Sequence, residues 1–419
     1  MKPTLVPQTL SHMGQGLAAG VSRPVSSSAR NRRLSTNRTA HLPVGTVAGL
    51  ETGGPGSWSL RMAAKPTEPP LRRAATVLLL VSLLSVVGGC RTPPRPGTAA
   101  PREGDEIVVA GRFIHTGTPV VTWLDPGGYD AYRVERRFSP LGASDWETSR
   151  QEVEALKTPN RYGPRRDRLT AEEVERVRGG GWDFGTLTNL VDQFVIHYDA
   201  CGTSRQCFKV LHDLRGLSVH FLLDLDGTIY QTLDLKERAW HATTANTRSV
   251  GIEMAQIGAC PPDRAGILET WYAPDSAGGT RITLPAHLGD GGIRTPGFVA
   301  RPARADPVRG SVQGIELVQY DFTPEQYRAL VRLTATLCRV FPRIRCDCPR
   351  DAAGQVIPHQ LDAGELAAFE GILGHWHIQA NKVDPGPAFQ WDGVLKGARE
   401  LLANGVHRRL ESPKGASLR

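Results

Sequence analysis

The sequence predicts an α/β fold, because short apolar strands alternate with helices along its second half. Residues 191–198 (VDQFVIHY) have the composition of a buried strand. Residues 218–231 predict a hairpin that turns at Asp226-Gly227. Residues 323–340 predict a helix, since Thr323 is a favourable cap and the proline that follows suits a first helical turn.

The remaining elements of this half are expected by the same reasoning. Helices are predicted at 206–214 and 391–402, and a further strand at 249–256. Residues 258–314 form a long insertion that is rich in glycine and proline and has few regular signals. Insertions of this length are usually functional lids or unstructured segments.

The N-terminal part divides by composition. Residues 1–61 are rich in Ser, Arg, Gly and Pro and lack periodicity, so we expect them to be disordered or to lie upstream of a true start at Met62. Short strands at 107–114 and 120–124 and a helix capped by Thr170 are predicted after them. The expected segments are a leader (62–89), a linker (90–105), an extension packed on the core or a small separate module (106–180), a core domain (181–405) and a tail (406–419).

The leader resembles that of an exported bacterial lipoprotein. Arg72 and Arg73 precede a 14-residue apolar stretch that is too short for a comfortable bilayer span. Val-Gly-Gly-Cys90 then resembles a lipobox, so we expect Cys90 to carry a lipid anchor; the alternative is an ordinary signal peptide with an incidental cysteine. Arg91 is unlike the aspartate that retains many lipoproteins in the inner membrane, which favours the outer membrane and the periplasm.

The basic charge does not indicate a nucleic-acid partner. Residues 1–89 contain ten of the 50 basic and two of the 42 acidic residues, so the whole net charge of +8 belongs to this stretch. Apart from Cys90, six cysteines remain, and an even set in an exported protein suggests disulfides. Cysteine metal sites are disfavoured because no pair has the C-x2-C spacing.

The stretch 374–387 (GHWHIQANKVDPGP) concentrates polar chemistry. It contains two histidines, a lysine and an aspartate, and the Pro-Gly-Pro after Asp384 predicts a rigid loop. Histidine and aspartate are good zinc ligands, and a catalytic zinc takes three protein ligands and leaves one position open. We expect the third ligand to come from a distant strand end, where His197 is the candidate.

Four blocks of the sequence together resemble the zinc N-acetylmuramoyl-L-alanine amidases of the type 2 amidase family, relatives of the peptidoglycan recognition proteins. The blocks are FVIHYD, SVHFLLDLDGTIYQ, RAWHATTANTRSVGIEM and GHWHIQANKVDPGPAFQW, in the family's order. They span about half of the chain. The resemblance implies a mixed central sheet flanked by helices with the site at one edge, and this architecture rests on the resemblance more than on strand counting.

The resemblance also implies the ligand set. It places the zinc ligands at His197, His375 and Asp384. His375 follows a glycine, as the family's second histidine does, and His377 is kept as a second-shell residue. If the two histidines lay on a strand they would share a face, so either could reach the metal. The choice stays open because the segment from His375 to Asp384 is one residue shorter than in familiar members of the family.

The family's other functional positions are implied in the same way. Glu253 would take a proton from the attacking water, and Lys382 would stabilise the oxyanion. His241 and Asn246 match positions that line the substrate groove, although a shifted register would make His241 a ligand. Cys201 and Cys207 have the place and spacing of a disulfide in the recognition proteins.

The expected function is hydrolysis of the amide between N-acetylmuramic acid and L-alanine in peptidoglycan, by a monomer with a lipid anchor and no nucleic-acid partner. The insertion, with Trp271 and Tyr272, is expected to cover glycan or stem peptide. Two alternatives are a non-hydrolysing peptidoglycan-binding lipoprotein, which would need a broken ligand set, and a zinc peptidase that cleaves stem peptides.

Overall fold

The computed structural model describes residues 95–178, 180–276 and 278–410. The predicted leader, the lipidation site Cys90 and the last nine residues lie outside this range. The chain divides into two compact units, and the unit described below begins at Pro101. Among the described residues, no helix has the length and apolar character needed to cross a bilayer.

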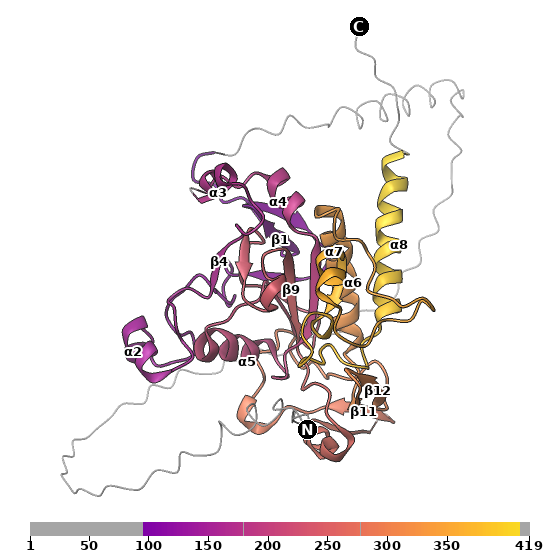
Figure 1. Cartoon of the computed structure of the whole chain (residues 1–419). Helices are drawn as coiled ribbons and strands as arrows, with labels where there is room; N and C mark the ends of the chain where they lie inside the picture. The colour runs from indigo at the N-terminus through magenta and orange to yellow at the C-terminus, as the bar shows by residue number, and fades with distance from the viewer. Residues whose placement is uncertain (1–94, 179, 277, 411–419) are drawn as a thin grey trace, which may run out of the picture. The chain divides into compact units, whose positions relative to one another are not determined.

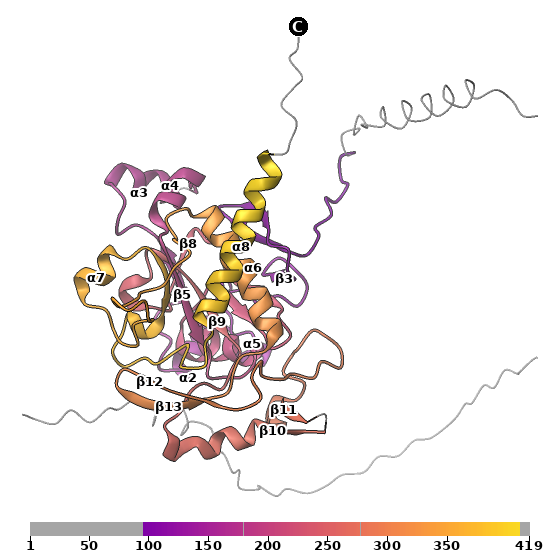
Figure 2. The ribbon, with the colours of Figure 1, turned by 90° about the vertical axis from the view of Figure 1, so that its right-hand side faces the viewer.

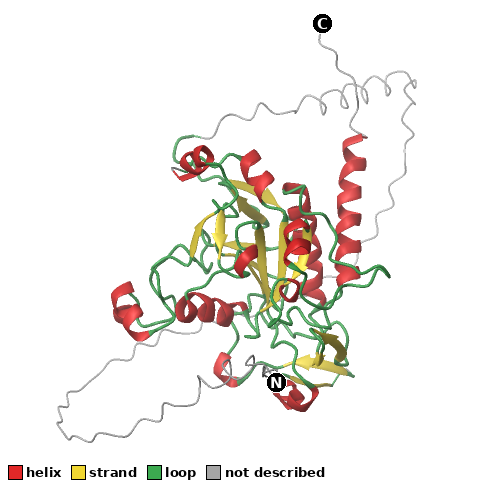
Figure 3. Cartoon of the chain, viewed as in Figure 1, coloured by secondary structure: helices red, strands yellow, loops and turns green. Residues whose placement is uncertain are grey.

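A mixed six-stranded sheet forms the centre of this unit, as the resemblance implied (Figure 3). Its strand order is β14-β5-β9-β6-β7-β3, with one antiparallel pair, β6 and β7, and parallel pairs elsewhere. The strands are β3 (Val120–Thr122), β5 (Gln193–Tyr198), β6 (Phe221–Leu223), β7 (Ile229–Gln231), β9 (Ser249–Met254) and β14 (Gly371–Gly374).

Several sequence predictions for this region are confirmed. The strand ending near His197 is β5, and the strand expected at 249–256 is β9. The hairpin of β6 and β7 turns where Asp226-Gly227 predicted it. Gly227 has φ +83°, a conformation that only glycine adopts readily, so this turn is encoded locally.

One face of the sheet packs against two helices (Figures 1 and 2). These are α6 (Pro324–Val340), which starts at a Thr323 capping box as predicted, and α8 (Trp391–Leu410), which continues past the expected end at residue 402. Phe194 and Ile196 of β5 share one apolar cluster with leucines of α6. Because side chains alternate along a strand, Val195 and His197 lie on the opposite face of β5.

The opposite face is covered partly by the helix predicted at 206–214. It is observed as α5 (Ser204–Phe208) followed without a break by a π-helical segment, η2 (Lys209–Arg215). Phe208 and Leu211 pack there with Leu222 of β6. This helix covers one part of the face and leaves the end of β5 near His197 to other segments.

Residues 106–180 contribute to the sheet through its edge strand β3. The region predicted as one strand at 107–114 is instead the hairpin β1 (Glu106–Val109) and β2 (Arg112–His115), because Ala110 and Gly111 both have positive φ and form a tight turn. The other elements are α2 (Trp146–Glu152), β4 (Tyr162–Pro164), which pairs with β8 (Glu237–Ala239), α3 (Ala171–Arg178), α4 (Phe184–Leu190) and the short helix η1 (Leu141–Ala143). The predicted cap Thr170 does accept the N–H of Glu173 at the start of α3.

The insertion 258–314 contains more regular structure than its sequence indicated. Its elements are η4 (Pro262–Thr270), β10 (Tyr272–Asp275), β11 (Gly279–Ile282), η5 (Ala286–Leu288) and β12 (Val308–Val312), which pairs with β13 (Ile315–Gln319). Trp271 and Tyr272 are each only 7% exposed and pack in an apolar cluster with Leu288. These two rings therefore build a small core inside the insertion, and the expectation that the insertion covers glycan or stem peptide stays a prediction.

Three short helices complete the described elements: η3 (Thr243–Ala245), α7 (Ala363–Ala368) and η6 (His375–His377). Of these, η6 follows directly after β14 and begins the loop that carries the candidate metal ligands.

Candidate metal centre

The parallel pairing of β14 with β5 brings the histidine segments together. Gly374, the last residue of β14, is the register partner of Ile196 in β5. His375 follows Gly374 and His197 follows Ile196, so the two histidines lie side by side at the same end of these strands. They are 178 residues apart in sequence. Asp384 returns to this point after the loop, and all three side chains are buried.

One atom from each of the three residues converges on a single point. Nδ1 of His197 lies 3.0 Å from Nδ1 of His375. Oδ2 of Asp384 lies 2.9 Å from the first nitrogen and 3.0 Å from the second. The predicted ligands thus form a buried group whose geometry could hold a metal ion; a second group of this kind, Glu103, Asp105 and His115, lies nearer the surface.

The outward-facing nitrogen of each imidazole has a partner of its own. Nε2 of His375 donates to Oε1 of Gln379 at 2.7 Å, and Nε2 of His197 lies 3.0 Å from Nδ1 of His241. A neutral imidazole carries one proton, so His375 with its proton on Nε2 presents a lone pair at Nδ1. Electron-pair donors then face one another across about 3 Å, an arrangement that a cation stabilises. The donor set of two imidazoles and a carboxylate fits zinc.

The protonation states suit metal binding as well. Burial, and then the neighbouring His375, lowers the pKa of His197 to about 4. Burial by itself would raise the pKa of Asp384, but the two imidazoles outweigh it and hold that pKa well below its usual range. The histidine is therefore neutral and the aspartate ionised at neutral pH, which are the forms that coordinate metals.

His377 does not share a face with His375, which corrects the strand-based expectation. The strand ends at Gly374, and the chain turns into η6, so the two side chains diverge. Nδ1 of His377 accepts the N–H of Gly374 at 2.9 Å, and its Nε2 lies 2.8 Å from the carbonyl of Ile357. Both nitrogens are thus occupied, and His377 fixes the start of the turn that presents His375.

Glu253 stands beside the three ligands on the neighbouring strand. It is the register partner of His197 in the parallel pair β5 and β9, so the two side chains lie on the same face. Its Oε2 is buried and has no hydrogen-bond partner among the described residues. Burial, then the charges of Asp384 and Asp199, raise the pKa of Glu253 well above its ordinary value. Such a carboxyl group can exchange a proton near neutral pH.

Lys382 lies on the same loop as Asp384 and is half-buried. Its positive charge contributes to lowering the pKa of Glu253 and of His197, which places its ammonium within electrostatic range of both. A cation at this position can stabilise negative charge that develops on a substrate.

The two positions predicted for the substrate groove lie behind the ligands. The ring of His241 contacts His197 and approaches Gly251 so closely that a Cβ there would lie 2.4 Å from its Nδ1. Nε2 of His241 lies 3.2 Å from Oγ of Ser249. Oδ1 of Asn246 accepts the N–H groups of His241 and Ala242, so this side chain orders the His241 segment. Their role in substrate binding stays a prediction.

Sequence reasoning missed the residues that support the ligands from outside. Gln379 and Ser249 lie within the blocks that carry the resemblance but were assigned no role, and the only further sequence signal for Gln379 is its place four residues after a ligand histidine. In the structure Gln379 contacts His375 directly, and Ser249 contacts His241, which in turn contacts His197.

The six described cysteines carry free thiols. The thiols of Cys201 and Cys207 are hydrogen-bonded neighbours, as are those of Cys338 and Cys346. The first pair is the one for which a disulfide was predicted, and that disulfide stays a prediction. The second pair brings Cys346 beside Cys338.

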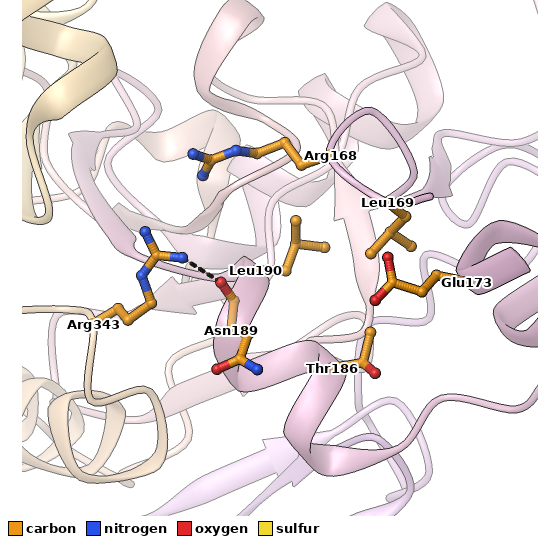
Figure 4. A pocket seen from close by; sticks show the side chains of 7 residues that line it. All are labelled: Arg168, Leu169, Glu173, Thr186, Asn189, Leu190 and Arg343. Atoms are coloured by element: carbon orange, nitrogen blue, oxygen red, sulfur yellow. Dashed lines mark hydrogen bonds between the residues drawn. The ribbon is translucent and has the colours of Figure 1, made fainter. Parts of the chain in front are cut away.

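A pocket of about 300 Å³ lies at the opposite end of β5 from His197 (Figure 4). It is lined by Arg168, Leu169, Glu173, Thr186, Asn189, Leu190 and Arg343. Arg168 pairs with Asp192 at 3.0 Å, and Arg343 donates to the carbonyl of Asn189 and pairs with Glu370. The charges around this pocket are therefore paired within the protein, unlike those of the metal centre.

Comparison with known proteins places this geometry in a family. Residues 187–387, just under half of the chain, match the sequence model of the family described as N-acetylmuramoyl-L-alanine amidase, Amidase_2. No curated protein matches the sequence.

The chain is also similar to solved amidase structures. One is a selenomethionine derivative of AmpD, at 17% identity and a TM-score of 0.26, covering 57% of this chain and 89% of that one. Another is the amidase AmiD from E. coli in complex with the substrate anhydro-N-acetylmuramic acid-L-Ala-D-γ-Glu-L-Lys, at 19% identity and a TM-score of 0.26, covering 49% and 57%. A third is the endolysin amidase LysCS from Clostridium intestinale, at 13% identity and a TM-score of 0.26, covering 51% and 86%.

The family match spans β5, β9 and the loop up to Pro387, and so includes every residue of the converging group. Residues 187–387 are thus similar to the domain that the N-acetylmuramoyl-L-alanine amidase family shares.

Proposed function

We propose that this protein is a zinc-dependent N-acetylmuramoyl-L-alanine amidase that hydrolyses the amide between the lactyl group of N-acetylmuramic acid and L-alanine in peptidoglycan. The observation that carries the proposal is the convergence of His197, His375 and Asp384 beside Glu253, whose Oε2 is buried and unpartnered among the described residues, within a region that matches the amidase family. A non-hydrolysing binder has no need for this combination.

His197, His375 and Asp384 are the residues that would hold the ion. When bound, zinc supplies a Lewis acid that polarises a carbonyl and lowers the pKa of water to about 7. Gln379 and His377 keep the His375 ring oriented with Nδ1 towards the site. Burial of the ligands excludes water from their far side, so substrate approaches only from the open side.

Glu253 performs the proton transfer. Burial raises the pKa of Glu253, and a carboxylate that is more basic than usual accepts a proton from the attacking water and later delivers it to the leaving amine of L-alanine. Lys382 stabilises the oxygen of the former carbonyl as negative charge develops on it, a contribution worth about 3 kcal/mol in comparable sites. Glu253 and Lys382 come from different segments, β9 and the ligand-bearing loop, and so reach the reacting amide from two sides.

The proposal extends to the setting of the enzyme. The leader from Met62 and the cysteine at position 90 support export and a lipid anchor, with action in the cell envelope, and the outer membrane is favoured. The six further cysteines are compatible with an oxidising compartment, where Cys201 and Cys207 would form a disulfide.

The test is digestion of purified peptidoglycan by zinc-loaded protein, with and without a chelator. Mass spectrometry should find stem peptides with a free L-alanine amine, and chelation should abolish them. In Glu253→Gln, the rate should fall by about 1000-fold while zinc remains bound, because only the proton transfer is lost. New amines at other positions would instead indicate a zinc peptidase, and binding to the wall without any cleavage would indicate a binding protein.

A further inference from the structure

The last part of the insertion is a hairpin that lies against the loop carrying the ligands. We call residues 375–388 the ligand loop. The hairpin consists of β12 and β13 and turns at Gln313-Gly314, where Gln313 has φ +55°. Non-glycine residues rarely adopt this conformation, and those that do are often held there for a functional reason. The backbone N–H of Gln313 is held by the carbonyl of Pro358 at 2.7 Å.

The side chain of Gln313 supplies hydrogen-bond donors to the ligand loop. Its Nε2 donates to the carbonyls of Trp376, Gln379 and Lys382 at 2.8, 3.2 and 3.3 Å, and its Oε1 accepts the N–H of Gln360 at 3.1 Å. The loop is neither strand nor long helix; the carbonyl of Gln379 also accepts the backbone N–H of Lys382 at 3.1 Å, and Gln313 adds a side-chain donor to all three carbonyls. The side-chain amide of Gln313 therefore contacts the backbone of the ligand loop before, at and after Gln379.

Gln379 connects this backbone contact to a metal ligand. Its carbonyl accepts from Gln313, while its side-chain Oε1 accepts from Nε2 of His375 at 2.7 Å. Displacing the Gln379 backbone would displace the oxygen that orients the imidazole. Partners of this kind usually change metal affinity when they are removed.

A second glutamine of the hairpin holds the end of the ligand loop. Gln319 is fully buried; its Nε2 donates to the carbonyl of Pro385 at 2.9 Å, and its Oε1 accepts the N–H of Ala388 at 2.9 Å. Gly386 has φ +85°, and a Cβ on it would lie 2.2 Å from Oε1 of Gln319. The glycine between the two prolines is thus required for the hairpin to approach this closely.

Gln319 also ties the loop to the strand that carries Glu253. Its Nε2 lies 3.0 Å from Oε1 of Gln256, two residues beyond the end of β9. The backbone N–H of Gln256 donates to Asp199, two residues after His197. The hairpin thereby joins the three segments that bear the site.

We propose that the β12–β13 hairpin is a positioning element for the metal centre, and that Gln313 sets the geometry of the ligand loop and through it the affinity for metal. The insertion then acts from behind the ligands, where the sequence had suggested a lid over substrate. The proposal rests on the proposed function for the identity of the metal alone.

The experiment compares two variants of Gln313 in the full chain with a control on the same hairpin. Gln313→Glu keeps the size of the side chain but cannot donate hydrogen bonds. Gln313→Gly removes the side chain and suits the positive φ, so we expect its melting temperature to stay near that of the parent protein. The control is Glu316→Gln, because Glu316 is exposed on β13 and takes no part in the site.

Zinc affinity, measured by competition with a chromophoric chelator, should weaken about tenfold in both Gln313 variants and stay unchanged in Glu316→Gln. Hydrogen exchange of the amides at 376–384 in metal-free protein should be faster in both Gln313 variants. This second measurement involves no metal, so it distinguishes failure of the hairpin proposal from failure of the zinc proposal. Parental zinc affinity together with parental exchange in the Gln313 variants would overturn the positioning role, whereas a parent protein that binds no zinc would overturn the proposed function.

Discussion

The two ends of strand β5 carry buried charged groups with opposite arrangements. At its start, Asp192 receives hydrogen bonds from Arg248 at 2.5 and 2.8 Å and from Arg168 at 3.0 Å, so its carboxylate oxygens face donors. At its end, His197, His375 and Asp384 turn acceptor atoms towards one another. Removing one partner of a buried ion pair leaves an uncompensated charge, whereas two imidazoles and a carboxylate that converge on one point are a donor set that fits a metal ion. Both clusters contain a buried carboxylate. They differ in the atoms that face it, which are guanidinium donors around Asp192 and imidazole nitrogens around Asp384.

Removing the carboxylate at the metal end should have the largest effect on metal binding. Asp384→Asn replaces a charged ligand by a poor one, and we expect zinc affinity to fall by at least about 100-fold. The measurement is competition with a chelator of known affinity. If Asp384→Asn retained the affinity of the parent protein, the converging group would not be the zinc site.

Removing the carboxylate at the other end should affect stability and leave the metal centre intact. Asp192→Asn leaves Arg248, whose side chain is 11% exposed, without its buried partner, and we expect a loss of about 3 kcal/mol in the free energy of unfolding. Zinc affinity of the folded variant should equal that of the parent protein. Chemical denaturation measures the first quantity. Arg168→Gln serves as the control and should cost less than about 1 kcal/mol, because Arg168 is 42% exposed.

A third buried carboxylate, Asp224, lies between these two cases, because it is neither fully paired nor surrounded by imidazoles. Asp224 is fully buried with one oxygen unpartnered among the described residues, but no imidazoles converge on it. Burial raises its pKa to about 7, above the value of about 3.9 in an unfolded chain. The folded state therefore binds more protons between these values, so this group's contribution to stability is present at low pH and is lost as the pH rises through 7.

In Asp224→Asn this loss should disappear. Relative to the variant, the parent protein should lose roughly 2 kcal/mol of unfolding free energy between pH 5 and pH 8. Urea denaturation at the two pH values gives the difference. An equal pH dependence in both proteins would show that the carboxyl group is not protonated in the folded state, and hence that an unpartnered oxygen alone does not mark a proton site.

Much of the site could be predicted because its residues belong to short local patterns. The strand before His197, the Asp226-Gly227 turn and the Asp384-Pro-Gly-Pro segment each specify their own backbone. The direction of His377 could not be predicted, since it depends on where β14 ends, and that end is set by pairing with a strand far away in sequence.

The contributions of the insertion and of the N-terminal extension could not be predicted either, because they depend on contacts with residues far away in sequence. Gln313 is an ordinary residue in a segment with few regular signals, and its significance lies in three carbonyls more than 60 residues away. Trp271 and Tyr272 also lie in this segment, and their packing with Leu288 in a small apolar core could not be predicted from it. A strand was predicted at 120–124 and is confirmed as β3, but its place at the edge of the central sheet follows only from its pairing with β7.

The pairing of β14 with β5 also determines when the site can come into existence. His197 and Asp384 are separated by 187 residues, and β14 begins at Gly371 in a chain of 419. During synthesis the N-terminal segments fold first, so β5 is made well before its neighbour β14. A nascent or truncated polypeptide that ends before β14 lacks two of the three candidate ligands. The converging group therefore forms only after residues 371–384 have been synthesised.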